Sequence, residues 1–251
     1  MKGTLFLACS VGLLCLAWWG RGREDTLRFV VPHDTNSVLY ATTFARQQAG
    51  DDWALQARRG GTVEVTQEAL ELTLDPQTPG RVRLLSTQRW LFEDFDLQAD
   101  AAATDGPLNN SYGVVFRRLN ENTYYLFYVS SDGYYSVWRE TPEQIVKLSD
   151  WIQSDAVEQG TDGAVNALRV VARGDTFQFY VNGQPLSVCI PDDRSGESTM
   201  SGGECVAGQL QPSLMDDTIP YGAVGVAVET ILEGGMAATF DNIVVMPVEA
   251  S

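Results

Sequence analysis

The stretch YGVVFRRLNENTYYLFYVSSDGYYSVWRE, residues Tyr112–Glu140, decides the fold class of this chain. Apolar and aromatic residues alternate with small or polar ones in three runs. Polar residues at Leu119–Asn122 separate the first two runs, and Ser131-Asp132-Gly133 separates the last two, where glycine supplies the positive φ of a tight hairpin. A period of two residues is typical of strands with one buried face. This stretch therefore predicts three consecutive antiparallel strands.

The same pattern continues on both sides of this stretch, and almost no helical periodicity follows Val38. Arg173-Gly174-Asp175 and Asn182-Gly183 are further turn signals. We expect the other strands at Thr62–Thr66, Ala69–Leu74, Val82–Leu85, Phe95–Ala102, Ile145–Leu148, Ala167–Ala172, Phe177–Val181, Pro185–Ile190, Tyr221–Glu229 and Ala237–Pro247. Many strands without βα alternation predict an all-β fold, a two-sheet antiparallel jelly-roll sandwich over residues 38–251 with six or seven strands in each sheet.

Composition excludes several classes of function. The chain has 251 residues, 44% of them hydrophobic, which is enough for one sizeable core. Its formal net charge is -16, from 17 Lys and Arg against 33 Asp and Glu. A duplex-binding protein needs clustered basic residues, so we expect no nucleic acid among the partners. The single histidine, His33, argues against histidine-rich metal sites and against Ser-His-Asp catalysis.

The N-terminus predicts export. Leu5–Trp19 is an uncharged run behind a basic start, as in a secretory signal, and Cys15 and Ala17 fit the positions before a cleavage site. The pair Trp18-Trp19, followed by two arginines, suits an uncleaved membrane anchor instead. We therefore interpret residues 1–23 as a signal peptide or membrane anchor and residues 24–37 as a linker. The expected location is extracellular or in the cell envelope, with membrane contact only through this segment.

The two remaining cysteines, Cys189 and Cys205, predict a disulfide in an oxidising compartment. Residues 191–219 are rich in Asp, Gly and Ser, and we interpret them as a long loop pinned by this disulfide. Carboxylates in and after the loop could supply oxygen ligands to Ca²⁺, the only cofactor that we consider; the alternative is a solvated acidic loop. The candidate ligands are Asp192, Asp193, Asp216 and Asp217, with Glu197 and Glu204 beside them.

An ordered set of short motifs resembles the concanavalin A-like lectin/glucanase superfamily. The motifs fall at Phe92–Phe95, Tyr112–Phe116, Asn122–Phe127, Asn166–Gly183, Gly222–Val226 and Phe240–Asn242. The resemblance extends to laminin-G-like, family-16-glycosidase-like and 3-keto-disaccharide-hydrolase-like domains. It implies a jelly-roll sandwich, and it leaves function open because this superfamily holds lectins, glycosidases and adhesive modules.

The catalytic motif of family-16 glucanases, Glu-x-Asp-x-Glu, is not present. The nearest segment is Asp94-Phe95-Asp96-Leu97-Gln98, where Gln98 would occupy the acid/base position and cannot donate and recover a proton. We interpret this segment as the polar outer face of a strand and assign no catalytic residue. Carboxylate pairs formed in three dimensions, for example Asp132 with Asp175 or Glu140, stay open.

Aromatic residues crowd the central hairpin on both of its faces. Tyr125, Phe127 and Val129 share one face, and Tyr124 and Tyr128 share the other. One set fills the core, so the second set is a candidate surface for stacking against the apolar faces of sugar rings. The alternative is that these rings also serve as core or cross-strand packing. The candidate ligand-binding residues are Tyr124, Tyr128, Tyr134 and Trp138.

These features predict an exported, non-catalytic binding module whose partner is an extracellular polysaccharide or a surface glycan. Two alternatives remain open. The first is a glycoside-acting enzyme resembling the 3-keto-disaccharide hydrolases, and the second is a structural or adhesion protein of the cell envelope. Carboxylates clustered in a groove would favour the enzyme, and exposed rings without carboxylates would favour the binder. The sequence does not indicate the oligomeric state.

Overall fold

The computed structural model describes residues 28–31, 37–44, 52–53, 61–66, 69–77, 82–193, 196–230 and 234–248. The predicted signal peptide or anchor, residues 1–23, lies outside them. No helix within these ranges has the length and apolar character needed to cross a membrane. Part of the predicted linker is a strand, because β1 (Phe29–Val30) pairs in parallel with β6 (Trp90–Leu91).

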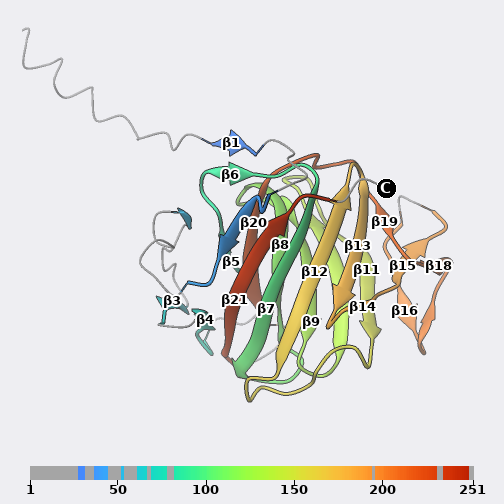
Figure 1. Cartoon of the computed structure of the whole chain (residues 1–251). Coiled ribbons are helices and arrows are strands. Elements are labelled where there is room, and N and C mark those ends of the chain that lie inside the picture. The colour runs from blue at the N-terminus through green and yellow to red at the C-terminus, as the bar shows by residue number, and fades with distance from the viewer. Residues whose placement is uncertain are drawn as a thin grey trace, which may run out of the picture.

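The first large sheet has six antiparallel strands (Figure 1). Tyr135 pairs with Val129 and Tyr112 also pairs with Val129, so the three strands of the central stretch are neighbours, as predicted. In spatial order the strands are β11 (Ile145–Gln153), β10 (Tyr134–Glu140), β9 (Thr123–Ser130), β8 (Ser111–Asn120), β20 (Ala223–Glu229) and β5 (Val82–Ser86).

The second large sheet has nine strands and lies in front of the first in Figure 1, so the two form a sandwich. The main path is β14 (Gln184–Pro185), β13 (Thr176–Val181), β12 (Val165–Arg173), β7 (Phe95–Asp105), β21 (Met236–Met246), β4 (Leu70–Leu74) and β3 (Gly61–Val65). Two short strands bring the count above the expected six or seven: β19 (Leu214–Met215) pairs with β13, and β2 (Tyr40–Thr42) pairs with β21.

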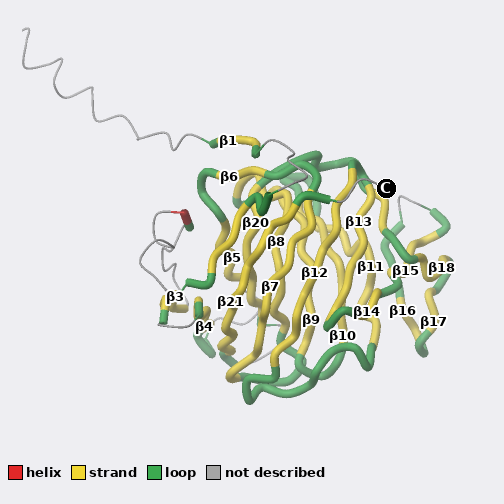
Figure 2. The backbone as a smooth tube through the Cα atoms, in the orientation of Figure 1, coloured by secondary structure: helices red, strands yellow, loops and turns green. Residues whose placement is uncertain are grey.

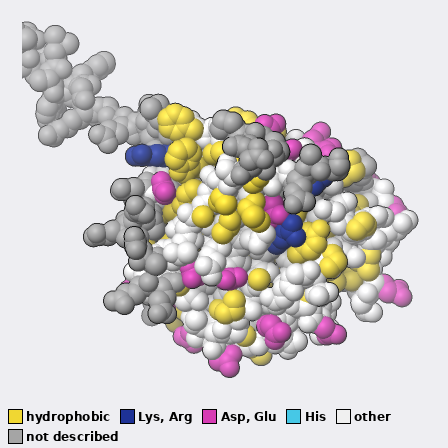
Figure 3. All heavy atoms as spheres, in the orientation of Figure 1, with side chains coloured by type: hydrophobic (Ala, Val, Ile, Leu, Met, Phe, Trp, Pro, Cys, Tyr) yellow, Lys and Arg dark blue, Asp and Glu magenta, His cyan; other side chains and the backbone are white. Residues whose placement is uncertain are grey.

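The core forms between the inner faces of the two sheets. Phe116 on β8 stacks on Tyr125 of β9 with ring centroids 5.2 Å apart, and Phe127 lies 5.1 Å from Phe179 of the opposite sheet. Aromatic pairs at these separations add to the stability gained from apolar burial. Loops join the strands at both ends of the sandwich (Figure 2). Over the face seen in Figure 3, acidic side chains are scattered and basic ones are few.

The predicted hairpin turns adopt the backbone that their sequences favour. Asn182 and Gly183 both have positive φ values, 51° and 76°, as a two-residue turn of type I′ requires. Gly133 has a φ of 93°, and Gly174, within the tripeptide Arg173-Gly174-Asp175, has 55°. The tripeptide is therefore the turn between β12 and β13.

The disulfide between Cys189 and Cys205 is present, and the region that it pins is more ordered than predicted. Residues 191–219 do not form one long loop. β15 (Val188–Pro191) pairs with β18 (Gly208–Gln211), and β16 (Met200–Ser201) pairs with β17 (Glu204–Cys205). These ribbons stand beside the sandwich, next to β11 (Figure 1). The expected strand Pro185–Ile190 overlaps β15, whereas β16, β17 and β18 were not predicted, because side-chain alternation is weak over such short strands.

Candidate functional site

The candidate site lies on the outer face of the six-stranded sheet, the face turned away from the core. Along β9, Tyr125, Phe127 and Val129 belong to the core, whereas Tyr124 and Tyr128 belong to a separate cluster. We call this the outer-face cluster: Val115, Tyr124, Leu126, Tyr128 and Ala227, with Trp138 and Trp151 packed against it. The split into two faces is the one that the sequence predicts.

The predicted ligand-binding residues differ in accessibility. Tyr124 and Tyr128 are only 2% and 1% exposed, so their rings lie beneath the accessible surface of this face. Tyr134 and Trp138 are half-buried and keep accessible ring surface. Trp151, also half-buried, joins them from β11. The sequence reasoning missed Trp151 because it ended this strand at Leu148, although the strand continues to Gln153.

Two of these rings border a hollow of about 220 Å³ at one end of the outer face. Tyr134 and Trp151 line it together with Asn109, Ser130 and Asp132. The hydroxyl of Ser130 donates to the carboxylate of Asp132 and accepts a hydrogen bond of 3.3 Å from the backbone amide of Tyr134. An aromatic wall beside a fixed carboxylate suits a sugar ring, whose apolar face stacks on the rings and whose hydroxyls hydrogen-bond to the carboxylate.

Polar side chains form a second group on the same face. Tyr124 donates a hydrogen bond to the carboxylate of Glu140, which lies opposite it on β10. Glu229 on β20 points to the same side as Ala227, since the two are separated by one residue of the strand. Burial, and then repulsion from the negative charge of Glu140, raise the pKa of Glu229 to about 7. Two carboxyl groups therefore share this face, and they interact strongly enough to alter proton binding.

Two donors at the outer face have no hydrogen-bond partner among the described residues. They are the hydroxyl of Tyr128 and the indole Nε1 of Trp138, both buried. Burial raises the pKa of Tyr128 well above its ordinary value, followed by the negative charge of Glu229, so this phenol stays protonated at neutral pH. Buried donors without partners are uncommon in stable folds and often mark functional sites.

The segment nearest to the family-16 motif has a structural role. It lies at the start of β7, with Asp94 just before the strand, in the nine-stranded sheet and away from the outer face. Arg169 donates to both carboxylate oxygens of Asp96, over 2.8 and 2.5 Å, and Asp94 accepts a hydrogen bond of 2.8 Å from the amide of Gly174. These carboxylates hold neighbouring elements together, as expected for a polar strand face.

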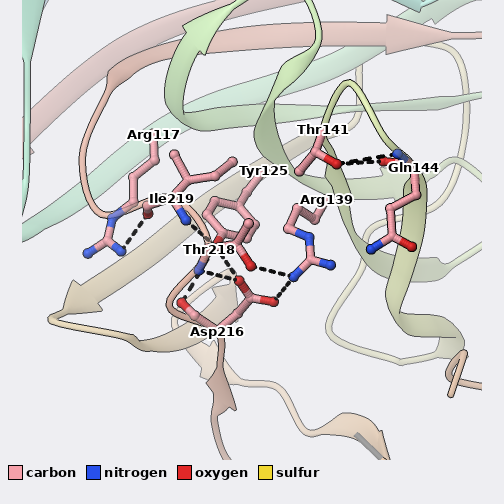
Figure 4. Close-up of polar contacts among 8 residues, drawn as sticks. All are labelled: Arg117, Tyr125, Arg139, Thr141, Gln144, Asp216, Thr218 and Ile219. Carbon is pink, nitrogen blue, oxygen red and sulfur yellow. Dashed lines mark hydrogen bonds and ion pairs between the residues drawn. The ribbon is translucent and has the colours of Figure 1, made fainter. Parts of the chain in front are cut away.

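The acidic residues predicted as calcium ligands do not form a cluster. Within the described ranges, no three His, Cys, Asp or Glu side chains lie close enough to hold a metal ion. The carboxylate of Asp216 is already engaged, because it accepts a hydrogen bond of 2.6 Å from the hydroxyl of Tyr125 and forms an ion pair with Arg139 (Figure 4). This arrangement gives no support to a calcium site formed with Asp192, Asp193 and Asp217.

Comparison with known proteins identifies relatives by structure alone. The sequence matches no protein-family model and no curated protein. The carbohydrate-binding module CBM66 from Bacillus subtilis superposes with a TM-score of 0.53 at 15% identity, over 78% of this chain and 95% of that one. A Bacillus subtilis protein of unknown function with a galectin-like fold gives 0.56 at 12% identity, over 86% and 98%. A β-1,3-1,4-glucanase (lichenase) from a mouse hindgut metagenome gives 0.54 at 10% identity, over 83% and 99%.

These similarities identify the architecture. The chain has the concanavalin A-like jelly-roll fold, as the ordered motifs predicted. Identities of 10–15% establish the fold and leave the function to the residues of the site.

Proposed function

We propose that this chain is a glycan-binding module that holds a neutral saccharide on the outer face of its six-stranded sheet. One observation carries the proposal: the accessible rings of Tyr134, Trp138 and Trp151 lie on one sheet face, beside a hollow that Tyr134 and Trp151 help to line. Sugar rings stack on aromatic side chains through their apolar faces, and their hydroxyls hydrogen-bond to carboxylates and amides. The nearby carboxyl groups of Asp132, Glu140 and Glu229 would repel an acidic sugar, so the ligand is neutral.

The names of the structural relatives agree with a glycan ligand, since one is a carbohydrate-binding module and another a glucanase. The proposal includes export, for which the Cys189–Cys205 disulfide is the supporting feature. In an exported protein the ligand is an extracellular polysaccharide or a surface glycan. Stacking of a sugar on the rings of Tyr134, Trp138 and Trp151 needs no catalytic group. We therefore propose binding without cleavage.

The Glu140–Glu229 pair favours a second candidate function, a glycoside-acting enzyme. Glycoside hydrolysis uses two carboxyl groups with separated pKa values, one protonated and one ionised. Glu229, with its pKa raised to about 7 by burial and by the negative charge of Glu140, suits the acid, and Glu140 is the second carboxyl group of the pair. Glu140 is, however, engaged by the hydroxyl of Tyr124, which leaves less of it free to attack a sugar or to activate water.

A glycan-array screen of residues 25–251, with mass analysis of the glycans after incubation, tests both functions. We expect binding without cleavage, and we expect Tyr134→Ala and Trp138→Ala to weaken it. Tyr180→Ala is the matched control, because Tyr180 is half-buried on the opposite sheet. Cleavage that disappears in Glu229→Gln would establish the enzyme instead. If the folded protein neither bound nor cleaved any glycan, both functions would be overturned and the structural or adhesion role would be favoured.

A further inference from the structure

A second and larger cavity, of about 580 Å³, lies beside the edge strand β11. It is bounded by the end of β10, by β11, by β15 and by the segment from β18 to β19. None of its lining residues belongs to the outer-face cluster or to the hollow beside Tyr134. Its volume is typical of sites for small ligands. No part of the function proposed above uses it.

The lining of this cavity contains more basic than acidic side chains, unlike the whole chain. Its lining contains two basic side chains, Arg139 and Lys147, and one acidic side chain, Asp216. In the complete sequence, acidic residues outnumber basic ones by 33 to 17. Each cation is paired with a carboxylate, Arg139 with Asp216 and Lys147 with Asp150, so the cavity offers charged donors and not a net positive field.

Arg139 is held rigidly and keeps unused donors. Its Nη1 forms the ion pair with Asp216 and donates to the hydroxyl of Thr218 over 2.7 Å (Figure 4). Asp216 is fixed in turn by the hydroxyl of Tyr125 and by the amide of Thr218, 3.0 Å away. Nε has no partner but is buried, and Figure 4 draws no hydrogen bond to the other terminal nitrogen, which is the donor left for a ligand. The guanidinium is thus positioned before a ligand arrives, which reduces the entropy lost on binding.

Other lining groups complement this cation. Figure 4 shows the side-chain amide of Gln144 on the same side of the hairpin end as Arg139, with no hydrogen bond drawn to it. The ammonium of Lys147 donates to Asp150 over 2.6 Å and lies 5.8 Å from the centroid of the Trp138 ring. Leu148, Leu214 and Met215 supply apolar walls. The cavity therefore offers several donors at one end and apolar surface elsewhere.

We infer that this cavity binds a small ligand bearing a carboxylate, with the carboxylate at Arg139 and Gln144 and the body of the ligand against Leu214 and Met215. Hydrogen bonds between a guanidinium and a carboxylate are charge-assisted and stronger than neutral ones. The body is either the ring of a uronic acid or the chain of an apolar acid. The outer-face proposal requires a neutral sugar, so the two sites differ in ligand chemistry and either can stand without the other.

Isothermal titration of the folded protein with matched ligand pairs tests the inference. The pairs are glucuronic acid with glucose, and hexanoic acid with hexanol. We expect at least one acid to bind while its neutral counterpart does not, and the pair that responds identifies the body of the ligand. Raising the salt concentration should weaken binding, because the attraction is electrostatic.

Two variants locate the binding. Arg139→Lys keeps the positive charge beside Asp216 but loses the planar donor array, and we expect at least about tenfold weaker binding. Met215→Trp alters a side chain that is 56% exposed, and it should fill the cavity and abolish binding without disturbing the core. Tyr134→Ala, on the outer face, should leave acid binding unchanged. Failure of both acids to bind at millimolar concentrations, equal binding of the neutral compounds, or full binding by folded Met215→Trp would overturn the inference.

Discussion

Tyr124 and Glu140 lie directly opposite each other on β9 and β10, and the phenol of Tyr124 donates a hydrogen bond to the Glu140 carboxylate. The bond holds the Glu140 carboxylate in place on the outer face of the sheet. Burial, followed by the hydrogen bond and the charge of Glu140, raises the pKa of Tyr124, so the phenol remains the donor at every physiological pH. The fixed charge also acts on Glu229, whose pKa it raises in addition to the effect of burial.

Glu229 should make the stability of the fold depend on pH. Its pKa rises from 4.5 in the unfolded chain to about 7 in the folded one. Its contribution to stability is therefore fully present below pH 4.5 and is lost as the pH rises through 7. Compared with Glu229→Gln, the natural protein should lose about 2–3 kcal/mol of unfolding free energy between pH 4 and pH 8. Urea denaturation at both pH values measures the difference.

Glu140→Gln is the matched control for this pH dependence. It removes the negative charge that repels ionised Glu229, and burial remains as the main cause of the raised pKa. The transition should therefore move to lower pH and become smaller. If the unfolding free energies of the natural protein and Glu229→Gln followed the same pH curve, the carboxyl of Glu229 would not be buried as described.

Trp151→Ala tests the contribution of Trp151 to glycan binding, which the sequence did not predict. Trp151 shares the hollow with Tyr134 and packs on the outer-face cluster. Loss of one stacking ring should weaken binding to a glycan found in the array about three- to tenfold, consistent with about 0.5–1.5 kcal/mol for an aromatic contact. Affinity electrophoresis in a gel containing that glycan measures the change. Unaltered mobility of a folded variant would exclude Trp151 from the site.

Arg117→Met should strongly destabilise the protein. Arg117 is 1% exposed, and it donates to the carbonyls of Ile219, Glu93 and Gly174 over 3.0, 3.0 and 2.5 Å. Methionine fills a similar volume but leaves the buried carbonyl of Ile219 and two partly buried carbonyls without this donor, at a cost of about 3 kcal/mol or more. Arg28→Met is the control. Arg28 is exposed and donates to the carbonyl of Leu119, and its loss should cost about 0.5 kcal/mol or less. Equal unfolding free energies for the two variants would refute the structural role of Arg117.

Removal of the disulfide should lower stability and loosen one wall of the larger cavity. Cys189 and Cys205 are separated by 16 positions, and a crosslink of that span contributes about 3 kcal/mol through the entropy of the unfolded chain. The double variant Cys189→Ser/Cys205→Ser should lose about that amount in urea denaturation. The natural protein in a reducing agent should behave the same way. An unchanged unfolding midpoint in both cases would show that the crosslink does not constrain the unfolded chain.

The sequence by itself determined most strands of the two large sheets, the tight turns and the disulfide. Alternation along Tyr112–Glu140 is a local property, and it placed three strands within a few residues of their observed bounds. Asn182-Gly183 and Gly133 sit at turns because positive φ is a requirement of the backbone itself. The sequence also separated the two faces of β9 correctly, since alternate side chains of a strand point to opposite sides.

Only the tertiary structure decided which rings stay accessible and which charges meet. Tyr124 and Tyr128 are covered by neighbours from other strands, whereas Tyr134 keeps accessible surface, and no local pattern distinguishes them. Glu140 and Glu229 come to one face because β20 returns beside β8 after about a hundred residues of chain. Arg139 meets Asp216 in the same way, across 77 positions. Side-chain alternation specifies a face, but strand order and register determine its neighbours, and these depend on the packing of the whole sandwich.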